Sequence, residues 1–182
     1  KVNAMADQIL LDGHELNTLG FMPEAESLTK SAWTLSQWIE ENSLREIEKE
    51  MGVAPGDLRV RVDHADWLMN ATRQICVNDN EIDAALTDSD VDLLEMIDVM
   101  QRRVSNGCKE DLLGLIAIRG VGRVRARILA NHGYRTPLEI CRITKKSAQK
   151  LADERGWSPL LVQNIMQAAD RAIQTRGRRP TD

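Results

Sequence analysis

The feature that most constrains this chain is a paired-glycine turn between two apolar helical runs, at residues 116–129. Gly120 and Gly122 flank Val121, and two glycines around one apolar residue let the backbone turn sharply without a Cβ penalty. Such a turn leaves unpaired N–H groups at the start of the next helix, where the helix dipole favours a phosphate oxygen. Val121 can anchor the turn in the core, and Ala126 is small enough for two helices to pack closely. The pattern is typical of a helix-hairpin-helix motif and predicts contact with a nucleic-acid backbone.

Four arginines surround this turn within nine residues: Arg119, Arg123, Arg125 and Arg127. They supply the cations that a phosphodiester-binding site needs. A helix corner whose glycines serve only as a cap could contain the same Gly-x-Gly, but it would not need this density of positive charge. We therefore predict that DNA backbone phosphates bind at residues 119–123, Arg125 and Arg127.

The charge of the chain changes sign along its length. Residues 1–108 contain 9 Lys+Arg and 21 Asp+Glu, a balance of −12, whereas residues 109–182 contain 15 and 7, a balance of +8. This separation predicts two units, of which the second faces a polyanion. We expect an acidic helical bundle at 5–107, a basic helix-hairpin-helix domain at 108–175 and a basic tail at 176–182. In the tail, Arg178 and Arg179 are expected to add phosphate contacts.

The composition favours helices and a chain without metal. Aromatic residues make up 3% of the chain and there are 5 prolines, while Leu, Ala, Glu and Arg, which favour helices, are abundant. We predict an all-α protein. No apolar run reaches the ~18 residues of a membrane span, and the N-terminus lacks a signal-peptide pattern. The 3 cysteines and 3 histidines do not have the spacing of metal ligands, so we expect no cofactor and a reducing, cytoplasmic setting associated with the nucleoid.

Helix signals divide the acidic half. A helix is expected at residues 24–42, and Thr87 or Ser89 is expected to cap a later helix that stops at Asn106. The residues expected on the apolar side of the first helix are Leu28, Ala32, Leu35 and Ile39.

Two further helices are expected between these. Ser43 and Glu46 form a capping box for a short helix that stops at Gly52. Asp57 is a suitable N-cap for a longer helix that runs to about Val77.

The long helix after Asp57 carries a tryptophan opposite its apolar stripe. Trp67 lies about 180° from that stripe on a helical wheel. Two interpretations follow: the helix is buried on two sides within a bundle, or the Trp67 ring is a platform on which a base stacks, with Arg59 on its flank. The stripe consists of Leu58, Val62, Ala65, Met69, Thr72 and Cys76.

The basic half continues after the paired-glycine turn with three more helix signals. Thr136 and Glu139 form a second capping box, a helix is expected at about 145–155, and Ser158 is expected to cap a helix through Ile173. The last two helices look like a second hairpin that has lost the Gly-x-Gly, and we interpret it as structural.

Four sequence blocks, at residues 53–58, 65–68, 109–113 and 119–127, resemble the C-terminal region of archaeal HelQ-type DNA helicases in the same order. These are superfamily II, 3′-to-5′ repair helicases, and the resemblance covers about residues 28–182. It implies a helical ratchet domain, whose long helix touches the translocating strand, and a helix-hairpin-helix domain that closes over the emerging strand.

The resemblance also implies individual roles. Trp67 matches the aromatic residue that stacks on a base, and Gly120, Gly122 and Arg123 match the hairpin. One departure is Val60, which stands where the family has a basic residue on the ratchet helix.

No Gly-x-x-x-x-Gly-Lys-Ser/Thr loop occurs in the sequence, so we expect no ATPase activity from this chain. ATP and Mg²⁺ would be needed only if motor domains lie upstream. The chain is then either the accessory part of a 3′-5′ DNA repair helicase, guiding single-stranded DNA, or a stand-alone helix-hairpin-helix adaptor. The adaptor would recruit a repair or replication partner through its acidic half. Both hypotheses predict single-stranded or branched DNA as a partner, and neither involves a membrane.

A third hypothesis is an enzyme, since hairpin motifs also occur in DNA glycosylases and nucleases. Bifunctional glycosylases place a lysine at the end of the hairpin, where this chain has Arg123. Nucleases of this kind need clustered carboxylates for metal ions, but the acidic runs at 46–50 and 88–92 fit a solvated face and a helix start. We therefore predict that this chain has no catalytic residues.

Overall fold

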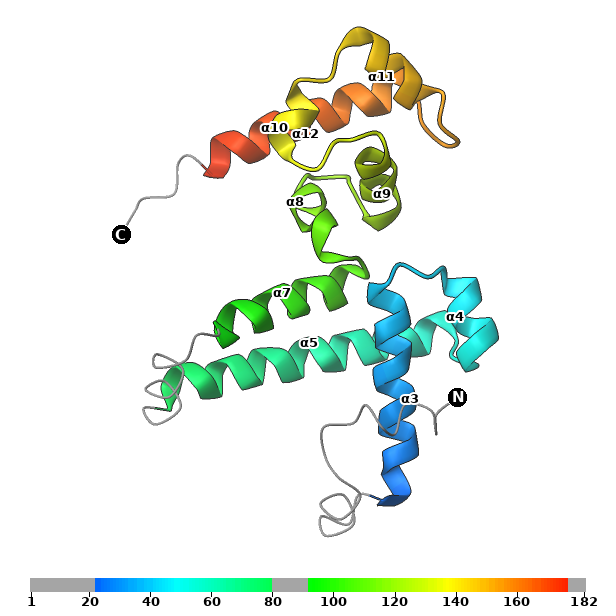
Figure 1. Cartoon of the computed structure of the whole chain (residues 1–182), viewed down its shortest axis with the longest axis vertical. Coiled ribbons are helices and arrows are strands. Elements are labelled where there is room, and N and C mark those ends of the chain that lie inside the picture. Colours follow the sequence, from blue (N-terminus) through cyan, green and yellow to red (C-terminus); the bar gives the residue numbers. More distant parts are fainter. Residues whose placement is uncertain (1–21, 80–91, 177–182) are drawn as a thin grey trace. The chain divides into compact units, whose positions relative to one another are not determined.

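The computed structural model describes residues 22–79 and 92–176, and within these ranges the chain forms helices and no strands (Figure 1). The predicted all-α fold class is confirmed. The chain divides into two compact units, residues 1–107 and 108–182. None of the helices in the described residues is long and apolar enough to cross a membrane.

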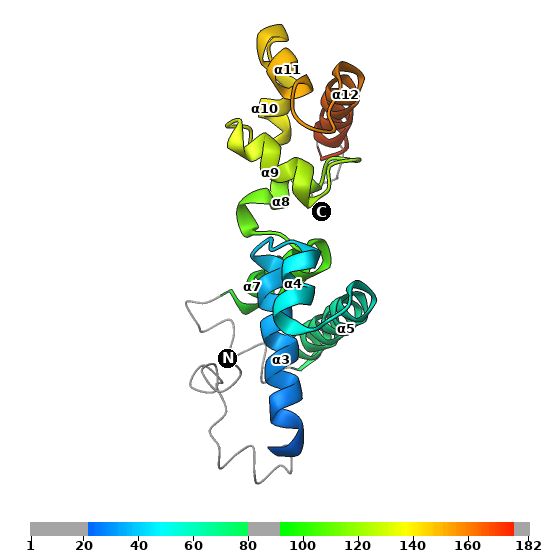
Figure 2. The ribbon, with the colours of Figure 1, turned by 90° about the vertical axis from the view of Figure 1, so that its right-hand side faces the viewer.

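The first unit is built around the long helix α5. In its described part the unit contains α3 (Met22–Ile39), α4 (Leu44–Met51), α5 (Pro55–Asn78) and α7 (Leu93–Asn106). Helix α7 packs along α5, and α3 contacts all three other helices (Figure 1). Figure 2 shows α4 beside the C-terminal part of α3. The buried core consists of Ile47, Val53, Leu58, Val62 and Val104.

The capping box at the start of α4 is confirmed. The Ser43 hydroxyl accepts a hydrogen bond from the Glu46 N–H at 3.2 Å, and the Glu46 carboxylate accepts one from the Ser43 N–H at 2.8 Å. Gly52 ends the helix in the left-handed conformation, with a φ of 61°. Both ends of α4 therefore lie where the sequence predicts them.

Two of the predicted N-caps are not those of the structure. Helix α5 begins at Pro55 with Ala54 as its N-cap, because the restricted φ of proline suits the first helical position; the prediction that Asp57 is the cap is therefore wrong. Asp92 caps α7 by accepting a hydrogen bond from the Glu95 N–H at 2.8 Å. The predicted caps Thr87 and Ser89 lie outside the described residues.

The predicted apolar side of α3 is correct for Leu35 and Ile39, which pack against the core, and wrong for its first half. Leu28 and Ala32 are exposed, whereas Thr29 and Thr34 are buried. The Thr34 hydroxyl donates to the Lys30 carbonyl at 2.7 Å, so its polar group is satisfied within the helix and its methyl group can pack. Hydrophobicity alone misplaces the first half of this stripe because a threonine whose hydroxyl bonds to its own helix can be buried.

Helix α7 ends against Trp38 of α3. The Trp38 indole Nε1–H donates to the Val104 carbonyl at 2.7 Å, which satisfies one of the acceptors that a helix C-terminus leaves open. Gly107 ends α7 with a φ of 62°, and a Cβ atom at this position would overlap the Trp38 ring. Trp38 thus packs against the core and also makes glycine necessary at residue 107.

The second unit holds the paired-glycine turn and packs its helices in two groups. Its described elements are η2 (Glu110–Leu112), α8 (Leu113–Ile116), α9 (Arg123–Asn131), α10 (Pro137–Cys141), α11 (Lys145–Ala152) and α12 (Pro159–Arg176). Helix α9 contacts η2 and α8, while α12 packs against α10 and α11. The large, fully buried side chains of this unit include Leu112, Leu115, Ile118, Leu129, Ile140 and Leu151.

The predicted caps of the second unit are confirmed. The Thr136 hydroxyl accepts from the Glu139 N–H at 3.3 Å, and the Glu139 carboxylate accepts from the Thr136 N–H at 3.1 Å. The Ser158 hydroxyl accepts from the Leu161 N–H at 3.2 Å. These local bonds set where α10 and α12 begin.

Candidate nucleic-acid interface

The paired-glycine turn has the geometry that the sequence predicts. Gly120 is left-handed, with a φ of 86°, and the Val121 N–H donates to the Ile118 carbonyl at 3.0 Å. Val121 is buried and anchors the turn in the core. Gly122 is the N-cap of α9 and has no side chain that could accept from the second and third amides of the helix, those of Val124 and Arg125. A helix start of this kind can bind an external anion.

The two glycines serve different purposes. The turn requires the left-handed conformation at residue 120, and most residues other than glycine adopt that conformation only with strain. Gly122 has a φ of −88° and a ψ of 175°, which any residue can adopt, and no protein atom lies within 4 Å of a Cβ placed there. Neither backbone conformation nor protein packing therefore requires a glycine at residue 122.

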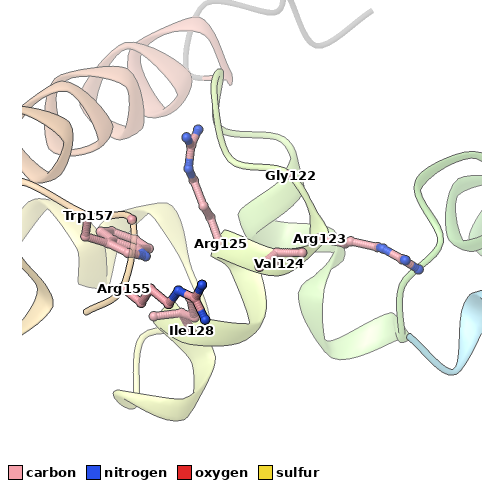
Figure 3. A pocket seen from close by; sticks show the side chains of 8 residues that line it. Gly122, Arg123, Val124, Arg125, Ile128, Arg155 and Trp157 are labelled. Atoms are coloured by element: carbon pink, nitrogen blue, oxygen red, sulfur yellow. The ribbon is translucent and has the colours of Figure 1, made fainter. Parts of the chain in front are cut away.

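Two of the predicted arginines lie exposed at this turn. Arg125 Nη1 donates to the Gly120 carbonyl at 2.8 Å, which holds its guanidinium over the turn. Arg119, the residue before Gly120, is exposed. Arg123 lines the space in front of α9, but its side chain extends away from the Arg125 side chain (Figure 3).

Arg127 has a structural partner instead. It makes a bidentate ion pair with Asp111, at 2.9 and 3.0 Å, and Arg135 binds the same carboxylate at 3.2 Å. The hydrogen bond from Arg127 outweighs the effect of burial and holds the pKa of Asp111 below its ordinary value. Because the folded-state pKa of Asp111 is depressed, the ion pair contributes its full stabilisation above the unfolded-state pKa of about 4. This stabilisation is lost as the pH falls from there through the lower folded-state pKa. Arg127 therefore joins α9 to η2, and its predicted phosphate contact stays a prediction.

A second turn with the same backbone geometry follows 36 residues later in the chain. Gly156 has a φ of 81°, and the Trp157 N–H donates to the Glu154 carbonyl at 3.0 Å, as Val121 does to Ile118. Ser158 takes the place of Gly122. The second hairpin has lost one glycine, as the sequence shows, but it has kept the turn.

The two turns border a common groove, which we call the α9 groove and which has a volume of about 510 Å³. Gly122, Val124, Arg125 and Ile128 line it from α9, and Arg155 and Trp157 line it from the second turn. Figure 3 shows Arg155, Trp157 and Ile128 together, with the Arg125 side chain extending away from Arg155 and Ile128. The groove thus combines an aromatic ring with three arginines, Arg123, Arg125 and Arg155.

A second groove lies between the first turn and α12, and we call it the α12 groove; its volume is about 370 Å³. Arg119, Gly120 and Arg125 line it from the turn, and Asn164, Gln167 and Arg171 line it from α12. Arginines and amides are the side chains that bind backbone phosphates. Arg125 lines both grooves and therefore connects them.

The first unit presents Trp67 to solvent. Its side chain is 67% exposed, so the interpretation that α5 is buried on both sides is wrong; the stacking role remains a prediction. Val60, Leu68 and Ile75 are also exposed and lie on the same side of α5 at helical spacing. Trp67 therefore belongs to an exposed apolar stripe.

The other predicted arginines contribute less to a site. Arg59 is exposed and pairs with Asp63 one turn along α5, at 3.0 Å, so part of its charge is balanced locally. Arg178 and Arg179 lie outside the described residues. No group of three or more His, Cys, Asp or Glu residues within the described ranges could hold a metal ion.

Sequence reasoning missed Arg155, Trp157 and Arg171 as candidate site residues. A usable signal was present for two of them, because Arg155-Gly156-Trp157-Ser158 repeats the pattern Arg119-Gly120-Val121-Gly122. For Arg171 there is no comparable signal, since only the packing of α12 brings it to the first turn.

Comparison with known proteins identifies the family. The family model described as "Archaeal helicase, domain 4" matches residues 5–107. The chain belongs to this archaeal helicase family. The resemblance inferred from the four sequence blocks is therefore confirmed.

Several curated ATP-dependent DNA helicases named Hel308 are similar to the chain. The Pyrobaculum calidifontis protein is 39% identical over 147 residues, 80% of this chain and 19% of the relative. The Methanocaldococcus jannaschii protein is 35% identical over 78% of this chain and 12% of the relative, and the Thermoplasma acidophilum protein is 30% identical over 85% and 21%. The chain thus spans about a fifth or less of the length of these helicases and corresponds to an accessory part of Hel308-type helicases.

Proposed function

We propose that this chain is the DNA-binding accessory region of a 3′-5′ DNA helicase, which holds the DNA backbone at the paired-glycine turn and guides a single strand. The observation that carries the proposal is Gly122, a glycine that neither conformation nor packing requires. It stands at the start of α9 beside Arg125 and Arg119, where a phosphate can approach the backbone amides. The named relatives are DNA helicases, which supports DNA as the partner.

The chemistry of the site supports binding without base preference. The groups around the turn are backbone amides and guanidinium groups, which contact phosphates and carry no sequence information. In this proposal the chain hydrolyses no ATP by itself, and any ATP-driven movement of DNA comes from motor domains of a full-length helicase.

The first test is the salt dependence of DNA binding by the purified chain. If about three phosphates are neutralised, by Arg119, Arg125 and Arg171, the logarithm of the binding constant for single-stranded DNA should fall with a slope of about −2 against the logarithm of salt concentration. Fluorescence anisotropy with a labelled oligonucleotide at several salt concentrations measures this slope. An affinity that does not change with salt, or DNA-stimulated ATP hydrolysis by the pure chain, would contradict the proposal.

The second test concerns guidance of the single strand by Trp67. Stacking is worth about 1–3 kcal/mol per base, so Trp67→Ala should weaken single-strand binding roughly tenfold. Duplex binding should change little, because paired bases offer no free face. The melting temperature should also change little, since the side chain is 67% exposed.

The matched control is Leu68→Ala, which removes a neighbouring apolar side chain that is 56% exposed and has no ring. It should leave single-strand affinity within about twofold. An equal loss of affinity in both variants would show that apolar contact in general, and not stacking, operates on α5.

A further inference from the structure

Trp157 occupies the position in the second turn that Val121 occupies in the first. Val121, at the same place in the first turn, is 4% exposed and closes the core. Trp157 makes the same backbone hydrogen bond, yet its side chain is only partly buried and lines the α9 groove. The second turn therefore presents part of a large aromatic ring to a groove, where the first turn buries its side chain.

The groove around this ring has the charge and apolar character that suit a nucleotide. Arg125 and Arg155 line it, Val124 and Ile128 add apolar surface, and no carboxylate is among the described residues that line it. The acidic residue nearest to Trp157 in the chain, Glu154, is held by His132 at 2.8 Å. A phosphate thus meets positive charge at the groove, and a base meets an aromatic and aliphatic surface.

The size of the groove also fits. A volume of about 510 Å³ falls in the range of sites that take small organic ligands. The groove begins at Gly122, where the phosphate of the proposed function approaches the backbone. A strand whose phosphate lies at this turn can therefore place a neighbouring base in the groove.

We infer that the α9 groove binds an unpaired nucleotide of single-stranded DNA, with its base stacked on Trp157 and its phosphate held between Gly122, Arg125 and Arg155. This inference rests on the proposed function and adds a second stacking site, on the second unit, to the one proposed at Trp67. Base identity matters little because every base has a π face. A duplex cannot use the site, since its bases are already stacked and paired.

The experiment uses the whole chain in a Trp67→Ala background, so that the other exposed ring does not contribute. Binding of an oligothymidine strand, of the same strand made wholly of abasic sites, and of a duplex is measured for this background and for added Trp157→Ala and Trp157→Phe changes. Leu160→Ala serves as the control, since Leu160 is 66% exposed and lies outside the groove lining.

Trp157→Ala should weaken binding of the oligothymidine strand roughly tenfold, whereas Trp157→Phe, Leu160→Ala and the duplex should change less than about threefold. The abasic strand should bind the background protein more weakly than oligothymidine does, and Trp157→Ala should weaken abasic binding no further. Removing the bases and removing the Trp157 ring should therefore not have additive effects on affinity, as is expected when both changes remove the same base–ring contact. Equal losses on abasic and normal strands would overturn the inference.

Trp157 fluorescence provides a measurement that does not depend on the alanine variant folding normally. Binding of oligothymidine should quench tryptophan emission in the background protein, and Trp157→Phe should remove most of that quenching. Unchanged quenching in Trp157→Phe would overturn the inference. Salt-dependent DNA binding that is indifferent to all Trp157 changes would refute the stacking site and leave the proposed function intact, whereas no salt-dependent binding by the background protein would refute both.

Discussion

Replacing Gly107 with alanine is expected to lower the free energy of unfolding of the first unit by about 3 kcal/mol. Two costs combine at this position. The φ of 62° is strained for any residue with a Cβ atom, and that Cβ would overlap the Trp38 ring. Trp38 cannot move away cheaply, because its indole N–H donates to the Val104 carbonyl at 2.7 Å and its ring packs against the core.

Gly52→Ala separates these two costs. Gly52 ends α4 with a φ of 61°, nearly the same as that of Gly107, but no protein atom lies within 4 Å of its added Cβ. We expect Gly52→Ala to lower the free energy of unfolding only by the cost of the backbone strain, about 1 kcal/mol. Urea denaturation of both variants, followed by circular dichroism, measures the difference. If the two changes are equally costly, the overlap with Trp38 does not contribute and our account of the α7 terminus is wrong.

Gly122→Val is expected to weaken DNA binding roughly thirtyfold while lowering the melting temperature only slightly, the small loss arising because valine is a poorer N-cap than glycine. The backbone at residue 122, with a φ of −88° and a ψ of 175°, suits a β-branched residue, and an added Cβ atom would meet no protein atom within 4 Å beyond its chain neighbours. It would instead occupy the space through which a phosphate reaches the first amides of α9. Loss of charge-assisted hydrogen bonds of this kind costs about 2 kcal/mol, which corresponds to the expected change in affinity.

Two further variants define the specificity of this effect. Gly56→Val, at another glycine with open surroundings, should change neither stability nor DNA affinity greatly. Arg123→Ala should weaken binding less than Gly122→Val, because one cation changes the salt slope by about one unit at most. A Gly122→Val protein that folds normally and binds DNA as the wild type does would show that the paired-glycine turn is not the site.

The sequence by itself determined the local features of this protein. The capping boxes at Ser43 and Thr136, the left-handed Gly120 and the helix stops at Gly52 and Gly107 all follow from bonds or conformations within a few residues. Such features depend on side-chain hydrogen bonding and backbone sterics that the neighbouring residues fully specify. The all-α class follows from the same propensities summed along the chain.

The tertiary structure alone decided which side of each helix is covered and which charges are free. Periodicity places Trp67 opposite the apolar stripe of α5, but whether a neighbour covers it depends on where α3 and α7 pack. Arg127 looks like a DNA-binding cation until folding brings Asp111 to within 2.9 Å. Trp157 likewise needs α9 and the second turn to meet before it can line a groove. Contacts between residues distant in the chain depend on the packing of whole elements, and no local pattern encodes them.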